Sequence, residues 1–162
     1  MENLFLENIK FRKLNKEDNE IFIDLRMAYI LETFDKISES EIDLLKINLN
    51  KYFSKHIEEN DFIGIIGEYN NKIITAAYLI INDFPPNPNR KNGKAGTLLN
   101  VYTFSEYRRR GAARKLMEKV IAEAKRTGLN SIELKATNDG YNLYKSIGFI
   151  DDDINKNLII RL

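Results

Sequence analysis

Four arginines lie within seven residues, where a strand is expected to give way to a helix. Arg108, Arg109 and Arg110 precede Gly111, and Arg114 follows it. The first turn of a helix has backbone N–H groups without partners inside the helix, and its dipole favours an anion. Cationic side chains there cost about 0.3–1 kcal/mol each, and a bound polyphosphate would compensate that cost. The spacing therefore indicates either a diphosphate site or a solvated basic turn, and the residues alone leave both open.

The residues that follow this cluster leave room for a ligand. Gly111 permits a positive φ or a close approach of the backbone, and Ala112 and Ala113 keep the start of the helix free of bulky side chains. The segment lacks the Gly-Lys-Ser/Thr of a P-loop and the Gly-x-Gly-x-x-Gly of a dinucleotide-binding fold. One diphosphate is the anion that a single helix turn can hold.

Composition excludes several other kinds of chemistry. The 162 residues include no cysteine and one histidine, His56. This rules out thiolate metal sites and cysteine nucleophiles, and it leaves little for a histidine metal site or a Ser-His-Asp triad. We therefore expect no metal. The 25 lysines and arginines against 24 aspartates and glutamates give a net charge of +1, which argues against a nucleic-acid-binding protein.

Length and hydropathy give the remaining expectations about the class of protein. A chain of 162 residues predicts a single domain over residues 1–162. Residues 1–7 carry acids where a signal peptide would carry bases. The longest apolar run, Ile73–Ile81, has nine residues against the roughly 20 of a membrane helix. We expect a cytoplasmic protein without membrane contact.

The helix after the arginines is the clearest element. Its apolar residues recur at steps of three and one, as on one face of an α-helix, at Ala113, Leu116, Met117, Val120, Ile121 and Ala124. A strand over Thr97–Thr103 precedes this helix, and a strand over Ser131–Ala136 follows it. Strand, helix and strand in this order predict a βαβ unit with parallel strands and a right-handed crossover.

The other elements predict a mixed sheet with helices packed on it. Phe62–Tyr69 and Lys72–Asn82 form a hairpin, because asparagines such as those at 70 and 71 tolerate positive φ. Ser38 and Glu41 have the spacing of a capping box that opens a helix. The remaining expected elements are a strand at Lys10–Leu14, a helix from Lys16 to about Glu32 with Ile21, Leu25, Ala28, Tyr29 and Leu31 inward, a loop at Phe84–Gly96, a helix at Asn138–Ser146 and two short strands after Phe149.

The arginine segment also resembles a known family. Arg108-x-x-Gly111-x-Ala113 is similar to the acyl-CoA signature Gln/Arg-x-x-Gly-x-Gly/Ala of the GNAT superfamily of N-acetyltransferases, and Tyr144 to Phe149 resembles its second hallmark, Tyr-x-x-x-Gly-Phe. The resemblance spans about residues 97–149. It implies an α/β (α+β) fold: a GNAT-like mixed, mostly antiparallel central sheet of about six to seven strands, with a parallel βαβ unit and about four flanking helices.

The same resemblance implies roles for particular residues. The stretch Val101-Tyr102-Thr103 would bind the pantetheine arm of acetyl-CoA like an added strand, through main-chain groups of Val101 and Thr103. Asn138 would reach the pantetheine from the far strand end, and Tyr144 would face the sulfur. The pyrophosphate would be held by backbone N–H groups with help from arginine side chains, over Arg108, Arg109, Arg110, Gly111, Ala112, Ala113 and Arg114. Asn100 stands where some members place a carboxylate base, and an amide cannot accept a proton in that role.

A tyrosine fits the implied chemistry. In acetyl transfer an amine attacks the thioester carbonyl and a thiolate leaves. A phenol with a pKa near 10 is protonated at neutral pH and can give its proton to a thiolate whose thiol has a pKa near 8.5. Main-chain N–H groups of a strand can stabilise the oxyanion. No base is assigned, although Glu32, Asp35, Glu68 and Asp83 lie in segments that could border the pocket.

Three functions remain open at this point. The first is an acetyl-CoA-dependent N-acetyltransferase acting on a primary amine, either a small molecule or a protein amino group, and a homodimer is compatible with it. The second is a non-catalytic acyl-CoA-binding sensor, which the missing base keeps open. The third is a nucleic-acid-binding module that uses 108–114 with Arg90, Lys91 and Lys94, although the near-zero net charge weighs against it.

Overall fold

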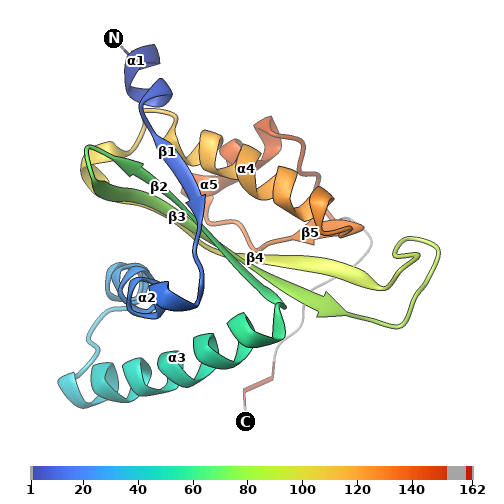
Figure 1. Ribbon diagram of the computed structural model, residues 1–162, viewed down its shortest axis with the longest axis horizontal. Coiled ribbons are helices and arrows are strands. Elements are labelled where there is room, and N and C mark those ends of the chain that lie inside the picture. The colour runs from blue at the N-terminus through green and yellow to red at the C-terminus, as the bar shows by residue number, and fades with distance from the viewer. Residues whose placement is uncertain (1, 153–159, 162) are drawn as a thin grey trace.

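One five-stranded sheet organises the chain in the computed structural model, which describes residues 2–152 and 160–161 (Figure 1). Its strands lie in the order of the sequence: β1 (Lys10–Lys13), β2 (Phe62–Tyr69), β3 (Lys72–Asp83), β4 (Lys94–Thr103) and β5 (Ser131–Glu133). The first three pairings are antiparallel, and β4 pairs with β5 in parallel. The mixed, mostly antiparallel sheet and the parallel βαβ unit expected from the sequence are therefore confirmed, but the described residues form five strands instead of the expected six to seven.

Helices cover both faces of this sheet (Figure 1). They are α1 (Glu2–Glu7), α2 (Asn19–Thr33), α3 (Glu39–Glu59), α4 (Ala112–Arg126) and α5 (Asn138–Ser146), with 3-10 turns η1 (Lys16–Asp18) and η2 (Ser105–Tyr107). On one face, Phe22 of α2 and Phe53 of α3 pack on Tyr78 of β3. On the other, Leu116 and Met117 of α4 pack on strand side chains. None of the helices in the part of the chain described is long and apolar enough to cross a membrane.

Local sequence signals explain several of these elements. Ser38 accepts a hydrogen bond from the Glu41 N–H, and the Glu41 side chain accepts one from the Ser38 N–H, so the expected capping box opens α3. Asn70 and Asn71 have φ of 49° and 59°, as the tight hairpin requires. Two elements have the bounds expected from the sequence, helix α5 (Asn138–Ser146) and strand β2 (Phe62–Tyr69).

The structure also corrects some expectations. A short helix α1, which the sequence did not suggest, precedes β1, and the helix expected from Lys16 begins as the 3-10 turn η1. Strand β5 ends at Glu133, three residues early, and β4 starts at Lys94, which shortens the loop. The two strands expected after Phe149 are not found at 149–152 or 160–161, and residues 153–159 and 162 lie outside the described residues.

Helix α2 buries Leu25 as expected, together with three side chains that were not expected to point inward. Phe22, Leu25, Met27 and Ile30 are buried, whereas Leu31 is 52% exposed. Apolar residues surround this helix on most sides, so periodicity alone did not define its inward face.

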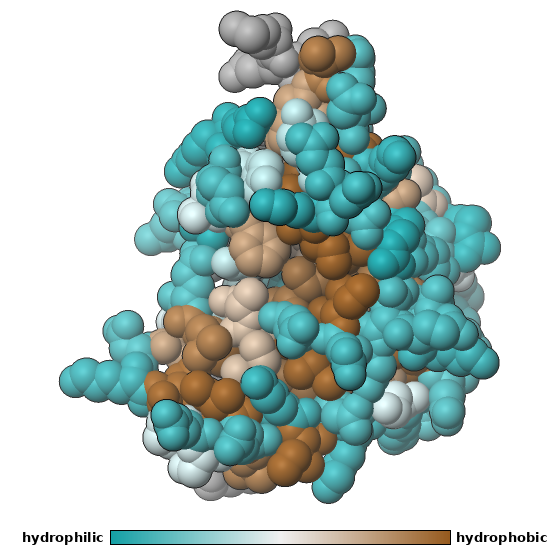
Figure 2. Space-filling model, turned by 60° about the vertical axis from the view of Figure 1, so that its left-hand side comes forward, coloured by the Kyte–Doolittle hydropathy of each residue, from teal (hydrophilic) through white to brown (hydrophobic). Residues whose placement is uncertain are grey.

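In the view of Figure 2 most protruding side chains are hydrophilic, and hydrophobic ones gather in the middle and near the bottom of the face.

An irregularity in β4 shapes the site. Ala76 of β3 pairs with Tyr102 and Tyr78 pairs with Leu99, so β4 places one extra residue opposite Ala77. Asn100 lies in this bulge with φ 54°, in the left-handed region. A bulge bends its strand and increases the local twist. Strand β5 pairs with β4 over Ala95–Thr97, and this pairing ends before the bulge.

Candidate active site

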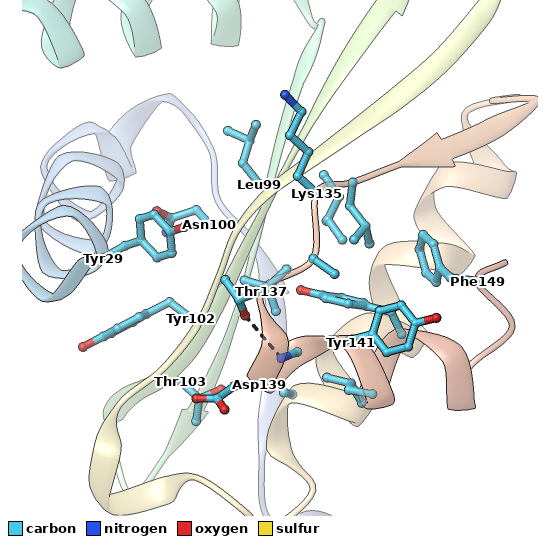
Figure 3. Close-up of a pocket in the computed structure, with 18 of the residues that line it drawn as sticks. Tyr29, Leu99, Asn100, Tyr102, Thr103, Lys135, Thr137, Asp139, Tyr141 and Phe149 are labelled. Carbon is cyan, nitrogen blue, oxygen red and sulfur yellow. Dashed lines mark hydrogen bonds between the residues drawn. The ribbon is translucent and has the colours of Figure 1, made fainter. Parts of the chain in front are cut away.

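A cleft opens where β4 and the chain after β5 separate. The parallel pairing ends at Thr97 opposite Glu133. Beyond it, Leu98–Thr103 and Leu134–Thr137 line opposite walls of a cleft of about 1520 Å³. Figure 3 shows Tyr29, Asn100 and Tyr102 on one side of this gap and Thr137, Tyr141 and Phe149 on the other. The cleft is large enough for an extended ligand of drug size or above, for which pockets of roughly 300–1,000 Å³ are common.

The edge of β4 presents backbone groups to this cleft. The Phe104 N–H donates to the Ile74 carbonyl in β3 at 3.0 Å. Because backbone groups alternate in direction along a strand, those of Val101 and Thr103 face away from β3. The Thr103 carbonyl accepts a hydrogen bond from Nε of Arg108 at 2.6 Å. An extended ligand can therefore pair with the backbone groups of Val101 and the N–H of Thr103, the residues that the resemblance implies for this role.

The N-terminus of α4 lies in the same cleft. Gly111 is its N-cap residue, with φ 85° and no side-chain cap, and no acidic residue occupies the first turn. Arg109 also has a positive φ, 60°, a conformation that costs a non-glycine residue about 1–3 kcal/mol and is concentrated at functional sites. The uncapped N–H groups of Ala112, Ala113 and Arg114 are ready to donate to an anion.

Helix α1 supports this turn from the side. A Cβ added to Gly111 would lie 3.1 Å from Cδ1 of Leu6. The Arg110 guanidinium carbon lies 3.7 Å from the centre of the Phe5 ring, a cation–π contact. The Phe5 ring also stacks on Tyr107 at 6.3 Å. Sequence reasoning missed this support, because the apolar stretch at Leu4–Leu6 is too short to indicate an element by itself.

Tyr144 lines the opposite side of the cleft. Its ring packs on Phe149 edge to face, with centroids 5.7 Å apart. Burial, and then the neighbouring Tyr29, raises the pKa of Tyr144 to about 12. Gly140, one helical turn earlier, leaves space for this ring. The phenol is therefore protonated at neutral pH and can donate a hydrogen bond into the cleft.

A network of three side chains joins α2 to the turn before α4. Nη2 of Arg108 donates to both carboxylate oxygens of Glu32, at 2.6 and 2.7 Å. The Tyr102 hydroxyl donates to Oε2 of Glu32 at 2.9 Å. The Arg108 hydrogen bond, more than that of Tyr102, holds the pKa of Glu32 below its usual value. Glu32 is consequently an anion at neutral pH.

Asn100 has a structural role. It is 3% exposed, and its Oδ1 accepts from Nη1 of Arg26 at 3.3 Å. Its Nδ2 is 3.5 Å from the carbonyl of Leu25, to which it donates. The amide thus ties α2 to the β4 bulge, as expected for a buried polar group.

Most of the site residues predicted from the sequence line the cleft together. These are Val101, Tyr102, Thr103, Arg108, Arg109, Gly111, Ala112, Ala113, Arg114 and Tyr144. Arg110 does not line it, since its guanidinium stacks on Phe5. Asn138, the first residue of α5, is exposed and lies outside the cleft lining. Arg114 reaches α5, where Nη2 donates to Oγ of Ser146 at 2.6 Å.

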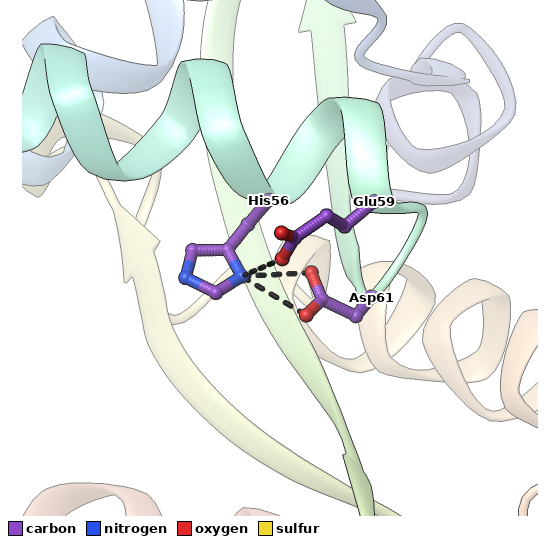
Figure 4. A group of neighbouring side chains, drawn as sticks. All are labelled: His56, Glu59 and Asp61. Atoms are coloured by element: carbon purple, nitrogen blue, oxygen red, sulfur yellow. Dashed lines mark hydrogen bonds and ion pairs between the residues drawn. The ribbon is translucent and has the colours of Figure 1, made fainter.

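The lone histidine lies in a second group of titratable side chains, at the C-terminal end of α3 (Figure 4). Nδ1 of His56 is 2.9 and 3.0 Å from the two carboxylate oxygens of Asp61 and 3.6 Å from Oε2 of Glu59. The ring of Tyr52 covers the imidazole at 4.2 Å between centroids. We assign this group a structural role, because it links the end of α3 to the residue before β2 and one nitrogen faces both carboxylates.

Comparisons with known proteins extend this description. A model of the acetyltransferase (GNAT) family matches residues 22–149, whereas no curated protein matches the chain. Among solved structures, a predicted acetyltransferase with acetyl-CoA from Clostridium acetobutylicum is 28% identical, with a TM-score of 0.82 over 93% of this chain and 96% of that one.

Two more distant structures share the fold. A GCN5-related N-acetyltransferase from Ralstonia eutropha JMP134 is 22% identical, with a TM-score of 0.77 over 93% of this chain and 98% of that one. A ribosomal-protein-alanine N-acetyltransferase from Brucella melitensis biovar Abortus 2308 is 17% identical, with a TM-score of 0.67 over 95% and 99% of the two chains.

Proposed function

The chain belongs to the acetyltransferase (GNAT) family and is an acyltransferase, and from this premise we propose that it transfers the acetyl group of acetyl-CoA to a primary amine. The acceptor is a small molecule or an amino group of a protein. One observation carries the proposal: a single cleft contains an unpaired strand edge, an uncapped helix N-terminus and a protonated tyrosine.

The described residues fit the parts of acetyl-CoA. The uncapped N–H groups at the start of α4 suit a diphosphate, which helix N-termini favour. The edge of β4 at Val101 and Thr103 suits the amides of the pantetheine arm, because an extended chain pairs with an open strand edge. The Clostridium acetobutylicum relative, 28% identical, is a structure with acetyl-CoA, which supports the same cosubstrate here.

The chemistry follows from this placement. Acetyl-CoA supplies a thioester, from which the amine nitrogen takes the acetyl group as the C–N bond forms, the C–S bond breaks and the amine loses a proton that the thiolate regains. Tyr144 donates a hydrogen bond to the departing sulfur. Since burial keeps its pKa near 12, the phenol is a weak acid, and we expect it to stabilise the sulfur as a donor more than to ionise. No metal ion takes part in these proposed steps.

The acceptor amine must also lose a proton to a base. Of the four carboxylates that the sequence placed near the pocket, Glu32 lines the cleft and Asp35, Glu68 and Asp83 do not. Because Arg108 lowers the pKa of Glu32, this carboxylate is a poor proton acceptor at neutral pH. We therefore propose that the acceptor loses its proton to water, and that alignment of the two substrates contributes most of the rate.

Calorimetry with coenzyme A and acetyl-CoA at low ionic strength tests this function. At about 100 times its dissociation constant, acetyl-CoA should stabilise the fold by about 2.7 kcal/mol, which shifts the melting temperature by several degrees. Release of free thiol with a panel of amines separates an acetyltransferase from a sensor that only binds the cosubstrate. A protein that binds neither ligand contradicts the proposal.

A further inference from the structure

Arg108 links the proposed diphosphate site at the start of α4 to Glu32 on α2. It stands three residues before Gly111, in the signature of the diphosphate site, yet its side chain is bound to Glu32 on α2. Both side chains are part-exposed to the cleft, Arg108 at 39% and Glu32 at 47%. The pair is thus open to ligands from either side.

A diphosphate would compete with Glu32 for this guanidinium. Arginine binds carboxylates and phosphates through the same planar pair of donors, and a diphosphate carries more negative charge than one carboxylate. An exposed ion pair of this kind is worth about 0–1 kcal/mol, and a bound phosphate must replace both this pair and the 2.6 Å hydrogen bond from Nε of Arg108 to the Thr103 carbonyl. When Arg108 turns to the diphosphate, Glu32 keeps its charge and loses its cationic partner.

The surroundings of the released carboxylate suit a cation. The Tyr102 hydroxyl would remain as a donor to Oε2 of Glu32, and Tyr29 and Phe34, close to Glu32 along the chain at the end of α2, also line the cleft. Aromatic faces and a carboxylate together recognise alkylammonium groups. Four other described carboxylates line the cleft: Glu133 pairs with Arg90, Asp151 pairs with Lys145, Asp139 lies in the first turn of α5 and Asp152 follows Asp151. Neither Arg90 nor Lys145 belongs to the diphosphate signature.

We propose that binding of the coenzyme A diphosphate draws Arg108 away from Glu32, and that the freed carboxylate then holds a second cationic group of the acceptor. The inference rests on the proposed function. The ammonium group that binds Glu32 is a different group from the amine that attacks acetyl-CoA. An attacking amine needs a free lone pair, whereas an ion pair with Glu32 would keep the bound nitrogen protonated. The acceptor class is therefore a di- or polycationic amine.

The experiment compares α,ω-diaminoalkanes of three to six carbons with monoamines of the same carbon number. Each is titrated calorimetrically into the full chain saturated with coenzyme A. For the wild type we expect at least one diamine to bind about tenfold more tightly than its monoamine. In Glu32→Gln this preference disappears, while coenzyme A itself binds several-fold more tightly, because Arg108 no longer has a competing partner. In turnover assays the variant raises KM for the diamine and leaves KM for the monoamine unchanged.

Glu118→Gln is the matched control. It removes one negative charge from α4, where Glu118 is exposed, pairs with Lys115 at 3.5 Å and does not line the cleft. This variant should bind all ligands as the wild type does. Equal binding of diamines and monoamines to the wild type overturns the inference, as does a Glu32→Gln variant whose affinity for coenzyme A is unchanged or lower. A wild type that fails to bind coenzyme A contradicts the proposed function itself, and that readout is separate.

Discussion

The ring of Tyr144 occupies the space into which a side chain on Gly140 would project, since a Cβ added to Gly140 would lie 2.9 Å from Cε2 of Tyr144. The two residues are four apart on α5 and share one face of the helix. Gly140 therefore fixes where the phenol stands in the cleft, which Gly140 also lines.

Gly140→Ala should reduce turnover without impairing cosubstrate binding. The added methyl group forces the Tyr144 ring to move by a few tenths of an ångström, and catalytic groups tolerate little misplacement. We expect kcat to fall about tenfold or more, with an unchanged dissociation constant for coenzyme A. Alanine is favoured over glycine in a helix by about 1 kcal/mol, so global instability would not account for the loss. Asn142→Ala, an exposed change on the same helix, serves as control, and an unaltered kcat in Gly140→Ala contradicts the argument.

Tyr144→Phe should lower kcat by about 100-fold, within the usual range for loss of a proton donor. The ring remains, so the packing on Phe149 and the stabilisation by acetyl-CoA should persist in thermal unfolding. Because the pKa of Tyr144 is raised to about 12, ionisation of this group should not reduce wild-type activity between pH 7 and 10. A decline in that window that disappears in Tyr144→Phe would show that the phenol ionises earlier.

Gly111→Ala should weaken coenzyme A binding and destabilise the fold. A left-handed conformation costs a side-chain-bearing residue about 1–2 kcal/mol, and the new methyl group would press on Leu6 at 3.1 Å. Gly128→Ala is the matched control, because Gly128 has φ 75° just beyond the other end of α4 and its Cβ would have a neighbour at 3.9 Å. Both variants should lose stability, whereas only Gly111→Ala should lose affinity in a calorimetric titration.

The acid stability of the fold should depend on Glu123. Hydrogen bonds from Arg126, and then from Lys13, lower the pKa of this 12% exposed carboxyl to about 2. A depressed pKa means that the stabilisation is complete above the usual value of about 4.3 and is lost as the pH falls through about 2. Thermal unfolding should therefore show a steeper loss of Tm between pH 5 and pH 2 in the wild type than in Glu123→Gln.

Glu118→Gln again provides the comparison. Glu118 lies on the same helix and pairs only weakly with Lys115 at 3.5 Å. Its removal should leave the acid limb of the Tm curve as it is in the wild type. If Glu123→Gln and Glu118→Gln give the same curve, Glu123 does not carry the acid dependence.

The features of this protein that depend on neighbours along the chain could be predicted from residue types and their spacing. The apolar stripe of α4, the capping box at Ser38 and the asparagine turn at 70–71 all act over three or four residues, so their geometry follows from residue type and spacing. The signature around Gly111 belongs to the same class, because a helix N-terminus and a glycine at positive φ are local features. That is why a diphosphate site at this helix N-terminus could be proposed before the fold was known.

Contacts between segments that are distant in the sequence could not be predicted in this way and became known with the folded structure. Glu32 and Arg108 are 76 residues apart, and an arginine in a phosphate signature gives no sign that a carboxylate of α2 will hold it. The face of α2 that is buried, the bulge at Asn100 and the position of Leu6 beside Gly111 have the same origin. Each of these features depends on which surfaces the sheet brings together. Many arrangements of the elements would match charges and bury apolar residues equally well in the sequence pattern, and only side-chain packing selects one of them.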